Sequence, residues 1–156
     1  MIKIVIPGYR KMELSSLVLD YNGTLAVDGK LVSAVKEKLP DLARHLKIHV
    51  ITADTFGAVK YEMGELPCEI VVIKGDKQAE QKLNYIKNLN AEKVVAIGNG
   101  RNDHLMLQYA GLGIATIQTE GSAALTLQSA DIVVTDIGHA LDLLNQPNRI
   151  KATLRQ

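Results

Sequence analysis

The sequence has few of the residues that cross-link or anchor small extracellular and membrane proteins. Its 156 residues include one cysteine, no tryptophan and four prolines. Because Cys68 has no partner within the chain, an intramolecular disulfide is excluded, and a reducing compartment fits. No stretch approaches the roughly 20 apolar residues of a membrane-spanning helix, and the apolar run at the start is too short for a signal peptide. We therefore expect a soluble, cytoplasmic protein.

An excess of charge of one sign is also missing. Eighteen Lys and Arg residues balance 17 Asp and Glu residues, which leaves a formal net charge of +1. We therefore expect no nucleic-acid partner and no membrane surface that depends on bulk electrostatics. The length suits a single domain over residues 1–156 with a hydrophobic core of its own.

What the sequence does contain is an alternation of short apolar runs and helix-period segments, which indicates an α/β domain with a mostly parallel sheet. The runs are rich in β-branched residues and lack polar alternation, as in strands buried on both faces. The expected strands are residues 2–6, 17–19, 48–51, 70–73, 94–97, 113–117 and 132–134, and the expected helices are 32–46, 56–63, 76–89, 103–110, 122–128 and 139–144.

Three local features complete this expectation. The run at 2–6 precedes the strand that ends near Asp20 and is expected as an added edge strand of the sheet. Asp28-Gly29 is typical of a tight hairpin turn. Asp76 is expected as the N-cap of the helix at 76–89.

Polar residues follow several of the expected strands, where open parallel sheets bind their ligands. They are Asp20, Thr52, residues 74–77, residues 99–103 and Asp136. An aspartate at a strand end can attack phosphorus, because its carboxylate forms an acyl phosphate that water later cleaves. Gly23 would let the loop backbone approach a phosphate, and Thr24 would bind the phosphate or hold the loop. An ordinary Asn-Gly turn is the alternative interpretation of this segment.

The other segments differ in how specifically they indicate a phosphate or metal site. Thr52 either binds a phosphoryl oxygen or caps the following helix. Lys77 either neutralises charge at the site or is an ordinary solvated lysine. Residues 98–103, GNGRND, are more specific, because a buried strand runs directly into glycines and oxygen-bearing side chains that suit a hard cation such as Mg²⁺.

In this order, the segments resemble the four motifs of the haloacid dehalogenase superfamily, which includes phosphatases and the phosphorylation domain of P-type ATPases. The similarity extends beyond the motifs. GNGRND at 98–103, GLGIA at 111–115 and ADIVV at 130–134 are similar to the P-type ATPase stretch that reads GDGxND, then a GIA strand, then an ADIV strand. The resemblance covers residues 17–136 and implies a three-layer, Rossmann-like α/β fold with a mostly parallel central sheet.

The resemblance also implies roles for individual residues. Asp20 matches the nucleophile, Thr52 the phosphate-binding hydroxyl and Lys77 the lysine of the third motif. Lys82 is a competing match, but we prefer Lys77 because it opens its helix at the carboxyl edge of the sheet. The implied Mg²⁺ ligands are Asp20, the backbone carbonyl of Asn22, Asn99 and Asp103, and the implied substrate-binding residues are Gly23, Thr24, Ala53 and Asn102.

Two residues depart from the family pattern. Asn22 stands where typical phosphatases have an aspartate that acts as general acid and base, and an amide cannot transfer that proton. Asn99 stands where GDGxND has its first acid, so the metal site has one carboxylate fewer.

The connections between the motifs leave no room for a large cap domain, so we expect a capless member that assembles as a homo-oligomer. The leading hypothesis is an Mg²⁺-dependent phosphohydrolase acting on a small phosphorylated substrate through an aspartyl-phosphate intermediate. The alternative is a binding or regulatory protein that kept the fold but lost efficient catalysis, as Asn22 and Asn99 suggest.

Overall fold

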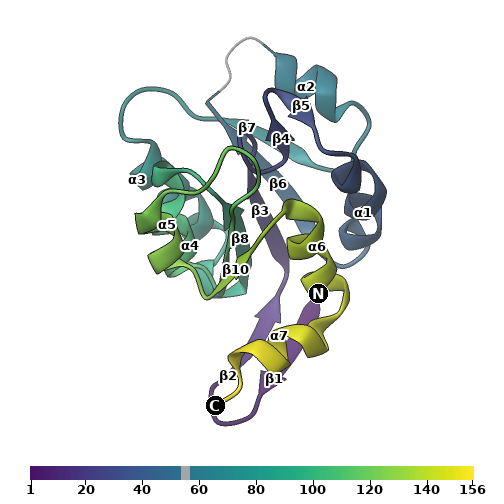
Figure 1. Ribbon diagram of the computed structural model, residues 1–156, viewed down its shortest axis with the longest axis vertical. Coiled ribbons are helices and arrows are strands. Elements are labelled where there is room, and N and C mark those ends of the chain that lie inside the picture. Colours follow the sequence, from purple (N-terminus) through teal and green to yellow (C-terminus); the bar gives the residue numbers. More distant parts are fainter. Residues whose placement is uncertain (54–56) are drawn as a thin grey trace.

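Six parallel strands form the central sheet of the computed structural model, which describes residues 1–53 and 57–156 (Figure 1). In chain order they are β3 (Ser16–Asp20), β6 (Lys47–Thr52), β7 (Glu69–Val72), β8 (Val94–Gly98), β9 (Leu112–Thr116) and β10 (Ile132–Val134). The order across the sheet is β10-β9-β8-β3-β6-β7, and every neighbouring pair is parallel. Each strand overlaps an expected apolar run, so the predicted parallel sheet is confirmed.

Helices cover both faces of this sheet. The helices α1 (Ser33–Ala43), α2 (Ala58–Met63), α6 (Ile137–Asn145) and α7 (Pro147–Leu154) contribute to one hydrophobic cluster, and α3 (Gln78–Asn88), α4 (His104–Tyr109) and α5 (Ala124–Ser129) contribute to the other. Figure 1 shows α3, α4 and α5 together on one side of the strands and α1 and α6 on the opposite side. The strand β3 supplies both clusters, because Leu17 and Leu19 point to one face and Val18 to the other. The expected three-layer fold is thus confirmed.

The helix boundaries differ from the expected ones in two places. The N-cap of α3 is Lys77, so the prediction that Asp76 caps this helix is wrong. The N-cap of α2 is Gly57, so Thr52 does not cap it. Phe56, where the helix at 56–63 was expected to begin, lies outside the described residues. Two 3₁₀ turns, η1 (Ala91–Lys93) and η2 (Arg101–Asp103), flank β8, and neither was expected.

The expected edge strand at 2–6 does not join the central sheet. It is β1 (Ile2–Ile6), which pairs antiparallel with β2 (Arg10–Leu14) in a separate two-stranded sheet beside α7. Its residues alternate, with Ile4 fully buried and Val5 about half exposed, which is the pattern of a sheet with one solvated face. Neither β2 nor α7 was expected. The helix α7 has Pro147 in its first turn, a frequent start signal.

A short hairpin is the one insertion between β3 and α1. It consists of β4 (Ala26–Val27) and β5 (Lys30–Leu31), which pair antiparallel. Asp28 and Gly29 have φ values of 50° and 74°, as the expected two-residue turn requires. Within the described part of the chain there is no large cap domain, and no helix is long and apolar enough to span a bilayer.

Candidate active site

The sheet reverses its order of growth at β3. From β3 the chain adds β6 and then β7 on one side, and it returns to place β8, β9 and β10 on the other side. Open α/β sheets bind ligands at such a switch point, outside the carboxyl ends of the strands. The strands β3 and β8 end there with Asp20 and Gly98, so the polar loops that follow them meet at one place.

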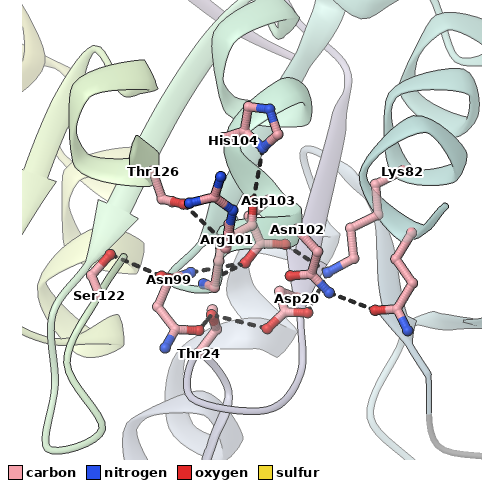
Figure 2. A network of polar contacts seen from close by, with 12 residues as sticks. Asp20, Thr24, Lys82, Asn99, Arg101, Asn102, Asp103, His104, Ser122 and Thr126 are labelled. Atoms are coloured by element: carbon pink, nitrogen blue, oxygen red, sulfur yellow. Dashed lines mark hydrogen bonds and ion pairs between the residues drawn. The ribbon is translucent and has the colours of Figure 1, made fainter. Parts of the chain in front are cut away.

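Asp20 is a buried carboxylate at the end of the central strand, with 7% of its surface exposed. It lies two residues after Val18, so its side chain points to the sheet face covered by α3 and α4. There the Lys82 Nζ donates to Asp20 Oδ1 at 2.5 Å, and the Thr24 hydroxyl lies 3.4 Å from Oδ2 (Figure 2). The side chain of Asp20 is therefore fixed from two sides.

Lys82 joins Asp20 to a second carboxylate. Its Nζ also lies 2.6 Å from Asp103 Oδ1, and only 1% of the lysine is exposed. Lys77 is exposed and caps α3, so the preference for Lys77 over Lys82 was wrong about which lysine reaches Asp20. The physical reason is the phase of the helix: Lys82 lies one turn before the buried Ile86, on the side of α3 that faces the sheet.

Asp103 organises the loop after β8. Its Oδ2 accepts hydrogen bonds from the backbone N–H groups of Asn99, at 3.0 Å, and Gly100, at 2.9 Å. A Cβ at Gly98 would lie 2.5 Å from this carboxylate, so only glycine fits there. The carboxylate thus satisfies two backbone donors while its other oxygen binds Lys82.

The loops after β3 and β8 are linked through Asn99 (Figure 2). Its Oδ1 accepts from the Thr24 hydroxyl at 3.1 Å, and its Nδ2 donates to the Gly121 carbonyl at 3.0 Å. Gly23 has a φ of 76°, and a Cβ there would come within 2.3 Å of the Asn99 amide. Glycine is needed at this position for both reasons.

Gln118, in the loop between β9 and α5, is a residue that the sequence did not reveal. Its Nε2 donates to the carbonyls of Gly23 and Thr24, both at 2.8 Å, and its Oε1 accepts from the N–H of Ile137 at 3.1 Å. Its φ of 44° is in the left-handed region, which is unusual for a residue other than glycine. One side chain therefore fixes the Asp20 loop to the start of α6.

The remaining expected site residues lie around this network. Asn22 is exposed, Thr52 is buried at the end of β6, and Ala53 is exposed just beyond it. Asn102 donates to Gln78 Oε1 at 2.7 Å, so its amide is held at the start of α3. Asp136 caps α6 by accepting from the N–H of His139.

The charges at the site shift the pKa values of Asp20 and Lys82. Burial, and after it the negative charge of Asp103, raises the pKa of Asp20 to about 7, and Lys82 offsets only part of this rise. Burial alone would lower the pKa of Lys82, but the two carboxylates outweigh it and raise that pKa above its ordinary value. An additional cation beside Asp20 would favour its ionised form.

The donor atoms fit a hard divalent cation. With both carboxyl groups ionised, Asp20 and Asp103 carry one negative charge more than Lys82 balances. Mg²⁺ in proteins is usually held by one or two carboxylates together with water and substrate phosphate. Among residues 1–53 and 57–156, no three His, Cys, Asp or Glu side chains gather as a metal cluster. Amide, backbone, water or phosphate oxygens would therefore supply the other ligands.

Comparison with known sequences finds a family model and relatives from one organism. A family model described as haloacid dehalogenase-like hydrolase matches residues 61–135. An uncharacterized protein of Methanocaldococcus jannaschii is 51% identical over 78 residues, which are 47% of this chain and 84% of that protein. A soluble P-type ATPase-like phosphatase of the same organism is 28% identical over 139 residues, which are 83% of this chain but only 50% of that protein.

Solved structures agree with this relation. The 3-deoxy-D-manno-octulosonate 8-phosphate phosphatase of Moraxella catarrhalis, in complex with magnesium, phosphate and KDO, matches with a TM-score of 0.70 at 17% identity, over 91% of this chain and 94% of that one. The catalytic domain of the CPx-ATPase CopB-B matches with a TM-score of 0.62 at 28% identity, over 74% and 46% of the two chains. Sequence and fold thus lead to one conclusion: the chain belongs to the haloacid dehalogenase superfamily and resembles the catalytic domain of P-type ATPases.

Proposed function

We propose that the chain is a metal-dependent phosphohydrolase in which the Asp20 carboxylate attacks phosphorus. The observation that carries this proposal is the position of that carboxylate. It is buried at the switch point of the sheet, held by Lys82 and beside Asp103. A nucleophile that is already fixed in place loses little freedom in the reaction, and a fixed ammonium stabilises the charge that develops on the phosphoryl oxygens.

The proposed reaction has two steps. An Asp20 oxygen forms a bond to phosphorus while the bond to the leaving oxygen breaks, which gives an acyl phosphate on Asp20. Water then attacks the phosphorus, and inorganic phosphate leaves as the carboxylate is restored. Asp20, Asp103, the Asn22 carbonyl and Asn99 would hold Mg²⁺, which when bound neutralises phosphate charge. Thr52, Gly23, Thr24, Ala53 and Asn102 are the proposed contacts of the transferred phosphate.

Asn22 limits the leaving groups that this reaction can use. It is exposed where typical phosphatases have an acid, and its amide cannot protonate a departing alkoxide. The leaving oxygen must therefore take its proton from water. We expect the first step to be much faster for aryl or acyl phosphates, whose leaving groups are weakly basic, than for alkyl phosphates.

The test compares the wild type with Asp20→Asn on phenyl phosphate in Mg²⁺ and in EDTA. We expect turnover only by the wild type in Mg²⁺, and a loss of at least about a thousandfold in the variant. Beryllium fluoride, a phosphate mimic, should raise the melting temperature of the wild type in Mg²⁺ but not that of Asp20→Asn. No turnover together with no fluoride effect would defeat the proposal.

A second function is favoured by the contacts of Asn99. Its amide is bonded to both Thr24 and Gly121, so it serves the loops where the family has a metal-binding acid. Together with Asn22, this fits a binding or regulatory protein of low activity. The double variant Asn22→Asp, Asn99→Asp separates the two functions. Activity that appears only in the double variant supports the second function, and wild-type turnover that depends on Asp20 excludes it.

A further inference from the structure

A cavity of about 570 Å³ lies beside the proposed phosphate site, and nothing above uses it. It opens between α2 and β7, past the end of β6. Its lining includes Thr52, Lys60, Cys68, Ile70, Val72 and Lys74. Ile51, the residue before Thr52, pairs with Asp20 across the sheet. The cavity therefore starts one residue away from the strand neighbour of the proposed nucleophile.

The lining of the cavity carries positive charge on an otherwise mostly apolar surface. Lys60 comes from the last turn of α2 and Lys74 follows β7, and no acidic side chain belongs to the described lining. Within the described residues, neither ammonium forms an ion pair. Two lysines on one cavity, with no acidic side chain among the described lining residues, favour an anionic occupant.

This charge is opposite to that of the network around Asp20. There, two carboxylates surround one lysine, and a phosphate needs a metal ion to approach. In the cavity, Lys60 and Lys74 attract an anion directly, while Ile70 and Val72 give the bound molecule an apolar surface. Thr52 is both a proposed contact of the transferred phosphate and part of the cavity lining, so a leaving group that extends past Thr52 would reach the cavity.

We propose that this cavity binds a second anionic group of the substrate, so that the preferred substrates are phosphate monoesters whose leaving group carries a carboxylate or another phosphate on a short apolar scaffold. This inference rests on the proposed function and names its substrate class. Lys60 and Lys74 determine specificity and contact the second anion, without a part in the transfer of the phosphoryl group.

The experiment uses esters of the same ring. Phenyl phosphate, 4-(hydroxymethyl)phenyl phosphate, 4-carboxyphenyl phosphate and 1,4-phenylene bisphosphate differ only in the group opposite the reacting phosphate. We expect the two charged esters to have lower KM values than the two others, and the order of these two tells which anion the cavity prefers. The advantage should shrink as salt is raised, because the lysines are exposed.

Variants then assign the effect to the cavity. Lys60→Gln and Lys74→Gln should each raise the KM of the charged esters roughly 5- to 10-fold, with kcat and the KM of phenyl phosphate within about twofold. Lys36→Gln removes the same charge from an exposed position on α1 and should change neither KM. Equal KM values for charged and uncharged esters in the wild type would overturn the proposal, and so would equal changes in Lys36→Gln.

A binding measurement separates this inference from the proposed function. Asp20→Asn is titrated with 4-carboxyphenyl phosphate and phenyl phosphate by calorimetry in Mg²⁺, with and without Lys60→Gln. Tighter binding of the carboxylated ester that is lost with Lys60→Gln supports the cavity even if the wild type shows no turnover. Equal affinities for the two esters overturn the inference and leave the proposed function standing.

Discussion

The two halves of the carboxyl edge are built in opposite ways. Around β3 and β8, the side chains of Lys82, Asp103 and Thr24 are at most 1% exposed, and each is hydrogen-bonded to a neighbouring loop or strand. Between α2 and β7 there is an open cavity with exposed lysines that have no ion-pair partner among the described residues. The difference teaches where each requirement lies: the proposed reacting groups are fixed before substrate arrives, whereas the residues proposed to select the substrate can change without disturbing the core.

The network around β3 and β8, with Asp20, Lys82 and Asp103, is called the fixed half below. The largest effect should come from removing its cation, Lys82. Lys82→Met leaves the buried carboxylates of Asp20 and Asp103 without a cation, so we expect the free energy of unfolding in EDTA to fall by about 3–5 kcal/mol at pH 8. Turnover should fall at least about a hundredfold. Because Mg²⁺ can replace the lost positive charge, its addition should restore more stability to the variant than to the wild type. Denaturant unfolding with and without Mg²⁺ measures both changes.

The matched control for this substitution is Lys77→Met. Lys77 is exposed at the start of α3, so we expect its loss to change stability by less than about 0.5 kcal/mol and turnover by less than twofold. The reverse result, an inactive Lys77→Met and an active Lys82→Met, would show that Lys77 and not Lys82 is the third-motif lysine.

The second effect concerns Asp20, whose substitution should change stability and activity in opposite directions. Since the pKa of Asp20 is about 7 in the folded chain and 3.8 in the unfolded one, ionisation of Asp20 opposes folding. This cost is absent below about pH 4, grows as the pH rises and is complete above pH 7. Asp20→Asn lacks it, so in EDTA at pH 8 the inactive variant should be more stable than the wild type, by at most about 4 kcal/mol.

Unfolding curves between pH 4 and pH 8 test this relation. The difference between variant and wild type should close toward pH 4, and Mg²⁺ at pH 8 should raise the stability of the wild type alone. A variant that is less stable than the wild type at pH 8 in EDTA would mean that Asp20 contributes to folding through Lys82 more than its burial costs.

Most of the fold could be predicted from the sequence, because buried parallel strands are apolar throughout and helices alternate with them. The β1–β2 hairpin and α7 were the main exceptions. The strand β2 carries Arg10, Lys11 and Glu13 on its more exposed positions, so only Met12 and Leu14 signal a buried face. Which strand pairs with β1 depends on contacts that no local pattern reveals.

The candidate site was predictable in its segments but less so in its contacts. Asp20, Asn99 and Asp103 were expected together from the motif order, and the structure places them together. Lys82 does carry a sequence signal, because with Ile86 and Leu89 it lies on one helical stripe at spacings of four and three. Gln118 had none, since its role depends on a left-handed backbone and on loops far apart in the chain.

Gln118 gives a smaller effect that tests how much the fixed half depends on loop contacts. Gln118→Glu keeps an acceptor for the Ile137 N–H but places an oxygen against the carbonyls of Gly23 and Thr24. We expect kcat to fall about tenfold, equivalent to about 1.4 kcal/mol, with KM unchanged. Gln118→Gly removes the same contacts but suits the positive φ, so it should lose activity with less loss of stability.

Kinetics and thermal melts of both variants distinguish positioning from support of the fold. A role in folding alone would lower the melting temperature in proportion to the lost contacts and leave kcat of the folded fraction unchanged. A role in positioning lowers kcat in both variants, including the one in which strain is relieved.

The smallest effect concerns the cavity between α2 and β7 and uses Cys68, the single cysteine of the chain, as a probe. Cys68 lines the cavity, and its thiol is half-buried, which raises its pKa and makes alkylation slow at neutral pH. Iodoacetate and iodoacetamide add groups of similar size, but only the first adds a negative charge. After complete reaction at pH 9, we expect the carboxymethylated protein to have a KM for 4-carboxyphenyl phosphate roughly threefold above that of the carbamidomethylated protein, because the new carboxylate competes for Lys60 and Lys74. Phenyl phosphate should not distinguish the two products, so a difference there would mean that the label disturbs the fixed half rather than the charge of the cavity.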